Sequence, residues 1–448
     1  MKLNSIKFAS AICLIAALLF GETVFAQSVA NSKTLSDVLK YALEENTDIK
    51  KQNLAILQSK YRRQEAISQG LPQINGSVQL VDNLQIQQQL LPGEIFGGAP
   101  GSFIPVKFGT QYSIPIALKL EQLIYSQSYI NAIKTTSAAK NLSQVQAEKV
   151  KQDIIYNSSV AFYQAIIASE QLNVIEANLK KLEQSVVVAQ VQYDNKMSRK
   201  IDLDQLKVNL ANTQADYTNA AISYAQSIDY LKVLIGFPLG DSLSLIQEAE
   251  SSDLTLPENT TASSPLMKLY DGQLKLKELE IKGINSGYAP TLAGFAQYGY
   301  QSQGNGFGKG ELRSFGSAAI GLSLNVPIFD GLRKLRQAQQ KKVELNSLQL
   351  EQKYTQTQLN FQYQNSVNKY LQSQKTVNNQ KNTYELAKSV YDAVQVNYNN
   401  GLASLSDLIN ADSGMKSAQT LYLTALLQQK VSALDVMKAN GNLNSLTK

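Results

Sequence analysis

Residues 190–206, QVQYDNKMSRKIDLDQL, match residues 395–411, QVNYNNGLASLSDLINA, at a constant offset of 205 positions. The identical pairs are Gln190/Gln395, Tyr193/Tyr398, Asn195/Asn400, Asp202/Asp407 and Leu203/Leu408. An earlier pair of segments, 65–79 and 281–297, also matches. The chain therefore contains two copies of one large unit, since solenoid repeats have a period of only ~20–50 residues. We expect a pseudo-symmetric molecule.

The positions of proline predict very long helices. All ten prolines lie outside residues 116–237 and 328–448, and a long stretch without this helix breaker is typical of helix. A helix from about Ser126 to Tyr193 would be ~100 Å long. We expect each copy to contain a short helix, a strand pair and a long helical hairpin. The copies would span 27–235 and 265–448, joined by a linker at 236–264.

The short helices have recognisable starts. Thr34, with Asp37 three residues later, predicts a capping-box start for a helix that ends near Gly70. In the second copy, the pair Ser264-Pro265 predicts a start, because proline suits the first helical position. We expect that helix to end near Gly287.

Four segments alternate between apolar and polar residues. In 110–121, TQYSIPIALKLE, one face carries Tyr112, Ile114, Ile116, Leu118 and Leu120. Segments 74–80 and 317–326 alternate in the same way, and 291–300 does so weakly. Such strands suit a membrane β-barrel, although alternation alone does not separate this from a half-buried soluble sheet and would by itself favour the soluble sheet. Residues 82–108, rich in Gln, Gly and Pro, are expected to form a long loop.

Composition excludes most enzyme chemistry. Residues 1–26 resemble a secretory signal peptide, with an apolar run too short to span a bilayer. The only cysteine, Cys13, lies in that segment, and the chain has no His or Trp. Imidazole and thiolate metal sites and His-dependent nucleophiles are therefore excluded, and no phosphate-binding glycine loop is present. We expect no enzyme activity and no cofactor or metal. The net charge of +6 is interspersed, so no nucleic-acid partner is indicated.

The long helices have a thin apolar stripe and a broad polar surface. This pattern fits either a coiled-coil rod or the wall of a water-filled tube. If the strands lie in a membrane, four cannot close a barrel, since bacterial barrels need at least about 8, and several subunits must contribute. Helices packed ~10 Å apart would leave a bore of ~28 Å in a trimer and ~15 Å in a dimer.

The chain resembles the TolC-type outer-membrane efflux family over almost all of its length after the signal. The resemblance rests on the opening run from Thr34 to Ile74, LIGFPLG (234–240), SLNVPIFDGLRKLRQAQ (323–339) and YNNGLASLSDLINA (398–411). It implies a mainly α fold that is internally duplicated and trimeric. It also implies a small transmembrane β-barrel with four strands per chain, in contact with outer-membrane lipid, and long antiparallel helices that form a periplasmic α-barrel. The implied partners are two further copies, a periplasmic adaptor protein and an inner-membrane transporter.

The resemblance also implies roles for residues of the two turns at the helical tips. The pore-aperture residues would be Asp407, Asn410, Asp202 and Tyr398. The adaptor-docking turns would contribute Asn195, Lys196, Arg199, Lys200, Asn400, Gly401, Leu402 and Ser404. In the family's closed-state latch the partner positions of the tyrosine correspond to Ala403 and Val187 here, so the latch is not reproduced at these positions. Arg199 and Lys200 of the other turn are the candidate substitutes.

Simpler roles stay open for the same residues. Asp202 and Asp407 could cap the returning helices, and one aspartate could both cap and line the pore. Tyr193 and Tyr398 could be packing residues, and Lys196, Arg199 and Lys200 could be a solvated turn. The predicted function is export across the periplasm and outer membrane, as the outer channel of a tripartite efflux or secretion system. The alternative is a periplasmic structural or adaptor protein with coiled-coil hairpins.

Overall fold

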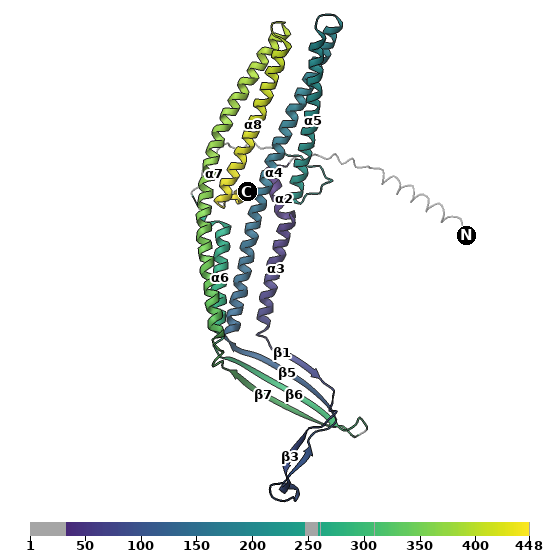
Figure 1. Cartoon of the computed structure of the whole chain (residues 1–448), viewed down its shortest axis with the longest axis vertical. Helices are drawn as coiled ribbons and strands as arrows, with labels where there is room; N and C mark the ends of the chain where they lie inside the picture. Colours follow the sequence, from purple (N-terminus) through teal and green to yellow (C-terminus); the bar gives the residue numbers. More distant parts are fainter. Residues whose placement is uncertain (1–32, 247–258, 260, 309, 448) are drawn as a thin grey trace, which may run out of the picture.

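The computed structural model describes residues 33–246, 259, 261–308 and 310–447. The predicted signal peptide, Cys13 and part of the predicted linker (247–258 and 260) lie outside the described residues. The chain is elongated, with long helices at one end and a sheet at the other (Figure 1). Among the described residues, no helix is both long enough and apolar enough to cross a membrane.

Two long helical hairpins form most of the molecule. The first consists of α4 (Gln127–Asp194) and α5 (Lys200–Ile235), and the second of α7 (Arg333–Asn399) and α8 (Leu405–Ala439). The predicted start of the first long helix is confirmed, because the Ser126 hydroxyl accepts from the backbone N–H of Tyr129 at 3.2 Å and caps α4. The two hairpins run side by side toward the tips (Figure 1).

The second short helix, α6 (Pro265–Ser286), has the predicted bounds, with Ser264 as its N-cap. The first was predicted as one helix from Thr34 to about Gly70, and this is wrong. The structure has α2 (Leu35–Glu45) and α3 (Thr47–Ser68), separated at Asn46, although the Thr34–Asp37 capping box is present. The Asn46 side chain accepts from the backbone N–H of Asp48 at 2.7 Å and donates to the carbonyl of Leu234 at 2.6 Å, so it caps α3 and tethers it to α5.

The sheet is antiparallel, in the order β1-β5-β6-β7. Its strands are β1 (Gln73–Val78), β5 (Tyr112–Ser126), β6 (Thr291–Gly304) and β7 (Arg313–Asn325), and the short β2 (Val81–Asp82) continues β1 along β5. The expectation of four strand positions is met. All four junctions with helices lie at one end of the sheet, and the two loops lie at the other.

Residues 82–108, which were expected to form a long loop, contain regular structure. They contain a second sheet, formed by β3 (Gln88–Pro92) and β4 (Phe103–Lys107) with a 3₁₀ turn, η1 (Gly93–Phe96), between them. This hairpin extends beyond the end of the main sheet, away from the helices (Figure 1). Two short 3₁₀ segments, η2 (Thr261–Ser263) and η3 (Leu443–Thr447), complete the described elements.

The main apolar core lies midway along the helices. It is built on Phe162 and Ile155 of α4, Leu39 of α2, Leu231 of α5 and Leu443 of η3, all fully buried. This core joins α2, the first described helix, to η3, the last described element. It fixes the roots of both hairpins, so the distant tips project from a rigid base.

Candidate functional site

The two turns at the helical tips are structurally equivalent. In the first turn the N–H of Met197 donates to the carbonyl of Gln192 at 2.7 Å, and in the second the N–H of Leu402 donates to that of Asn397 at 2.8 Å. Both pairs obey the offset of 205 positions. The two tips therefore share one backbone design, as the repeat in the sequence predicts.

Each turn contains a left-handed residue at the same position. Gly401 has φ +72° and Lys196 has φ +58°. Glycine adopts this conformation freely, whereas a residue with a Cβ is strained there by about 1–2 kcal/mol. The first turn therefore holds a lysine under strain where the second holds a relaxed glycine.

The next residue of each turn is an exposed apolar side chain. Met197 is 78% exposed and Leu402 is 79% exposed. Asn195 and Asn400 end the outgoing helices as C-caps. In the first turn Lys196, Arg199 and Lys200 flank Met197 in the sequence. The second turn carries no such cations. Each tip thus presents one exposed apolar side chain, and the charged residues near it differ between the two turns.

Asp407 caps α8. Its carboxylate accepts from the Ser404 N–H at 3.0 Å and from the Ser404 hydroxyl at 2.7 Å, while the Ser404 hydroxyl accepts from the Asp407 N–H at 3.2 Å. The hydrogen bonds from Ser404 lower the pKa of the Asp407 carboxyl below its usual range. The side chain is nevertheless exposed, so one residue satisfies the capping role and still offers a negative charge at the tip.

Asp202 occupies the equivalent position in α5 but has a different partner. Arg199 donates to its two carboxylate oxygens at 3.0 and 2.9 Å, and this lowers the pKa of Asp202. Arg199 takes the N-cap position that Ser404 has in the second turn. The ion pair closes within one turn, so in this conformation Arg199 does not bridge the hairpins.

An apolar cluster at the tips joins the two hairpins. Buried Leu203 and Leu206 of α5 gather with Leu405 of α8, and Tyr398 of α7 packs against the cluster. Burial raises the pKa of the Tyr398 hydroxyl, and nearby Asp202 raises it further. Tyr398 is thus a packing residue close to a carboxylate, whereas Asn410 on α8 is exposed.

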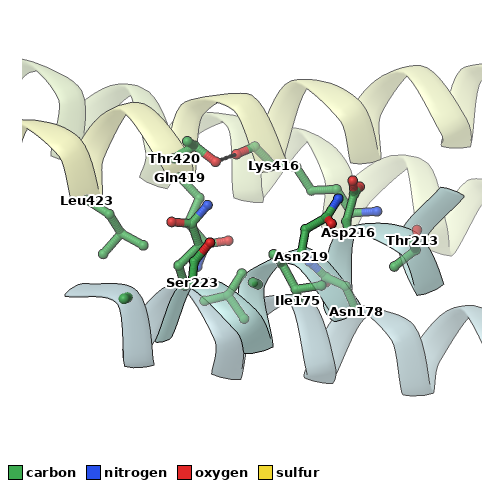
Figure 2. Close-up of a pocket in the computed structure, with 14 residues that line it drawn as sticks. Ile175, Asn178, Thr213, Asp216, Asn219, Ser223, Lys416, Gln419, Thr420 and Leu423 are labelled. Atoms are coloured by element: carbon green, nitrogen blue, oxygen red, sulfur yellow. Dashed lines mark hydrogen bonds between the residues drawn. The ribbon is translucent and has the colours of Figure 1, made fainter. Parts of the chain in front are cut away.

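Below the tips, a groove of about 330 Å³ separates the two hairpins. Figure 2 shows α8 in pale yellow across from α4 and α5 in pale blue. Its apolar lining includes Ile175 and Leu423, and its polar lining is rich in amides and hydroxyls: Asn178, Thr213, Asn219, Ser223, Gln419 and Thr420. Thr420 donates to the Lys416 carbonyl at 3.0 Å (dashed in Figure 2), and the Lys416 ammonium pairs with Asp412 at 2.7 Å.

Sequence reasoning missed this groove and the exposed Met197. Met197 could have been found from the sequence, because the repeat offset aligns it with Leu402, which was assigned to the second docking turn. The groove had a weaker signal in the concentration of small and amide side chains on α5 and α8. Within the described parts of the chain, no cluster of three or more His, Cys, Asp or Glu side chains could hold a metal ion.

The family comparison agrees with this architecture. The model of the outer membrane efflux protein family matches residues 256–442. The outer membrane protein TolC of Escherichia coli (strain K12) is 21% identical over 345 residues, which cover 73% of this chain and 69% of TolC. The chain is thus similar to TolC-type outer-membrane efflux proteins. A second relative, the probable outer membrane lipoprotein SilC of Salmonella typhimurium, is 20% identical over 341 residues, or 71% of each chain.

Solved structures of TolC-type channels share the fold. The CmeC outer membrane channel of Campylobacter jejuni superposes with a TM-score of 0.73 at 17% identity, covering 91% of this chain and 85% of CmeC. The open state of the MtrE outer membrane channel of Neisseria gonorrhoeae gives 0.71 at 18% identity, covering 92% and 90%. The predicted mainly α fold with long helices and a small sheet is thereby confirmed. The family model and the TolC match agree with the predicted role in outer-membrane efflux.

Proposed function

We propose that this TolC-type protein is the outer channel of a tripartite export system and acts as a homotrimer. Three copies would close the sheets into one outer-membrane barrel and the hairpins into one periplasmic tube. Each copy would consist of two repeats, 27–235 and 265–448, delivered across the inner membrane by the signal peptide at 1–26. A periplasmic adaptor would connect the tube to an inner-membrane transporter.

The observation that carries this proposal is the sheet. Strand register places Ile74, Leu120, Ala296 and Ile320 in one row on one face, and Val78, Ile116 and Tyr300 lie in another row of that face. These side chains are largely uncovered, and Ile320 is 87% exposed. An exposed apolar band across all strands is unfavourable in water and suits contact with lipid.

The opposite face of the sheet is polar. Asn75, Lys119 and Gln297 share one row, and Lys119 forms an ion pair with Glu121 on the same strand. Farther along, the Gln301 amide donates to the Ser113 hydroxyl at 3.3 Å. This face is suited to a water-filled interior, as a channel requires.

The edges of the sheet support closure by further copies. Among the described residues, β1 pairs only with β5 and β7 pairs only with β6, so both outer edges lack partners. Open edges cannot face lipid, because their backbone groups would be left without hydrogen bonds. When three four-stranded sheets join edge to edge, the backbone groups of each edge find hydrogen-bond partners. The resulting 12 strands exceed the number of about 8 that a barrel needs.

The tips are the proposed aperture and docking surface. Asp407, Asn410, Asp202 and Tyr398 would surround the narrowest part of the tube. Two turns would meet the adaptor, the first through Asn195, Lys196, Arg199 and Lys200 and the second through Asn400, Gly401, Leu402 and Ser404. The groove between the hairpins would allow them to move relative to each other as the aperture opens.

The test is purification from outer membranes, native mass measurement and planar-bilayer recording. We expect extraction only with detergent, a mass of three copies and discrete channel conductance. A protein that is released without detergent as a monomer would instead favour the periplasmic structural or adaptor role. Loss of drug or metabolite export in a deletion strain, restored by the wild-type chain, would connect the channel to efflux.

A further inference from the structure

The hairpin β3–β4 is a built element with a fixed tip. The Gly93 N–H donates to the Ser102 carbonyl at 2.7 Å, and the Gly98 N–H donates to the Gly93 carbonyl at 2.8 Å. The carboxylate of Glu94 accepts from the Gly101 N–H at 3.1 Å. These bonds hold η1 across the end of the hairpin, so the side chains of the tip are presented in a fixed arrangement.

The base of the hairpin is tied to the main sheet. The N–H of Asn83 donates to the Gln111 carbonyl at 2.7 Å, and its side-chain amide donates to the Thr110 carbonyl at 2.9 Å. The Gln111 N–H in turn donates to the Asn305 side chain, in the loop after β6, at 3.1 Å. The hairpin is thereby anchored from both loops at this end of the sheet.

The hairpin exposes many large apolar side chains. Ile95 is 70% exposed and Phe96 is 57% exposed. The exposed set is Leu84, Leu90, Ile95, Phe96, Phe103, Ile104 and Phe108. A rigid element with so many uncovered apolar groups indicates an interaction surface.

Charge limits what can cover this surface. Residues 82–108 contain only three charged side chains, Asp82, Glu94 and Lys107, and Glu94 is used within the tip. A phosphate-rich headgroup layer would require several cations, which this hairpin does not have. The surface therefore fits an uncharged apolar partner.

The position of the hairpin identifies the partner as the same hairpin of neighbouring copies. It follows directly from β2, on the side of β5 where the sheet edge is open. In the proposed trimer this edge meets β7 of the next copy, so one hairpin stands beside each of the three seams. This inference therefore rests on the trimer of the proposed function.

The β3–β4 hairpin is long enough to reach the central axis of the proposed barrel. With strands ~4.8 Å apart and tilted by ~40°, a barrel of three such sheets has a radius of ~12 Å. The stem of β3 has five residues and spans ~17 Å at ~3.4 Å per residue. We propose that the three β3–β4 hairpins, which project beyond the outer mouth of the channel, converge on its axis and pack through Ile95, Phe96 and Phe103 into an apolar lid.

The first test is a single-cysteine crosslink. The chain has no cysteine other than Cys13, so F96C introduces the sole thiol of the processed protein. Mild oxidation of whole cells should give a disulfide-linked pair of copies on a non-reducing gel. The control, I328C, replaces a side chain that is even more exposed, 93% against 57% for Phe96. It lies at the opposite end of the sheet and should give no crosslink. Equal crosslinking of both variants, or of neither, in a protein that retains the native mass of a trimer would overturn the lid.

The second test measures access to the interior. S317C places a thiol on the polar face of β7, beside Gly299. A small maleimide added outside intact cells should label it, whereas a long polyethylene-glycol maleimide should not. Replacing residues 88–107 by Asn-Gly should abolish that protection. Labelling by the long reagent with the hairpin intact would refute the lid, whereas a wild-type mass other than a trimer would instead refute the proposed function.

Discussion

Lys196 and Gly401 occupy the same left-handed position, one in each tip turn, with φ +58° and +72°. Their neighbours Met197 and Leu402 are exposed to almost the same extent. The two copies thus share the backbone of the turn and its exposed apolar side chain. They differ at the left-handed position, where the lysine is strained and the glycine is not. The first turn retains a cation at a position where glycine would be relaxed.

We expect K196G to stabilise the first turn, because glycine removes a strain of about 1–2 kcal/mol. The greater freedom of glycine in the unfolded chain offsets part of this gain, by about 0.4–1 kcal/mol. Hydrogen exchange at residues 191–199 should therefore become slower. The reciprocal change, G401K, should accelerate exchange in the second turn. Faster exchange in K196G would show that the side chain of Lys196 makes a compensating contact.

Asn46 gives a second stability prediction. N46A removes the N-cap of α3, which is worth about 1 kcal/mol, and the hydrogen bond to Leu234, which contributes about 0.5–1.5 kcal/mol. Thermal unfolding of the protein in detergent should shift to lower temperature. N46D keeps the capping oxygen but loses the amide donor. Its unfolding temperature should therefore lie between those of N46A and the wild type. An unfolding temperature of N46A equal to that of the wild type would mean that α2 and α3 can join into one helix without loss of stability.

Lys196 and Asn46 show how far the structure can be predicted from the sequence. The repeat offset aligns Lys196 with Gly401, so the turn could be placed from sequence, as could the helix starts at Ser126 and Ser264. The break at Asn46 could not, because it depends on a tertiary hydrogen bond to Leu234, 188 positions away. The β3–β4 hairpin was missed because Gln, Gly and Pro dominate its sequence and hide two short strands. The groove was missed because it arises between hairpins, which periodicity along one helix does not report.

The two faces of β5 predict opposite effects for the same substitution. I116R places a charge on the apolar face, at a cost of about 2–4 kcal/mol at the membrane midplane. Assembly into the outer membrane should fall sharply. S113R places the same group on the polar face, near Gln301, and should be tolerated. Assembly measured by trypsin-resistant trimer on gels should separate the two variants, and equal loss would mean that the face assignment is wrong.

Asp407 is expected to set ion selectivity at the aperture. In a trimer, three exposed carboxylates in a constriction favour cations. D407N should lower cation selectivity in planar-bilayer recordings, and because Asn410 is neutral, little selectivity should remain. D202N should have a smaller effect, since Arg199 already neutralises Asp202.

The capping box supplies the control for this experiment. S404A removes the hydroxyl that caps α8, at a cost of about 1 kcal/mol, but leaves the charge of Asp407 in place. It should loosen the tip in hydrogen exchange while retaining most of the cation selectivity. If S404A and D407N change selectivity equally, or if neither does, Asp407 acts only as a helix cap.

The pH dependence of selectivity follows from the same hydrogen bonds. Ser404 lowers the pKa of Asp407 below its ordinary value of 3.8. The carboxylate therefore keeps its charge as the pH falls through 3.8 and is neutralised only at a lower pH. The sign for stability is the same: the capping contribution is present above the unfolded-state pKa and is lost as the pH falls through the lower folded-state pKa. Reversal potentials recorded against pH should show cation selectivity persisting to lower pH in the wild type than in S404A, because repulsion among the three carboxylates acts on both proteins and only the hydrogen bonds differ. In D407N the profile should be flat. A wild-type midpoint at or above that of S404A would contradict the hydrogen-bonded carboxylate as the selective group.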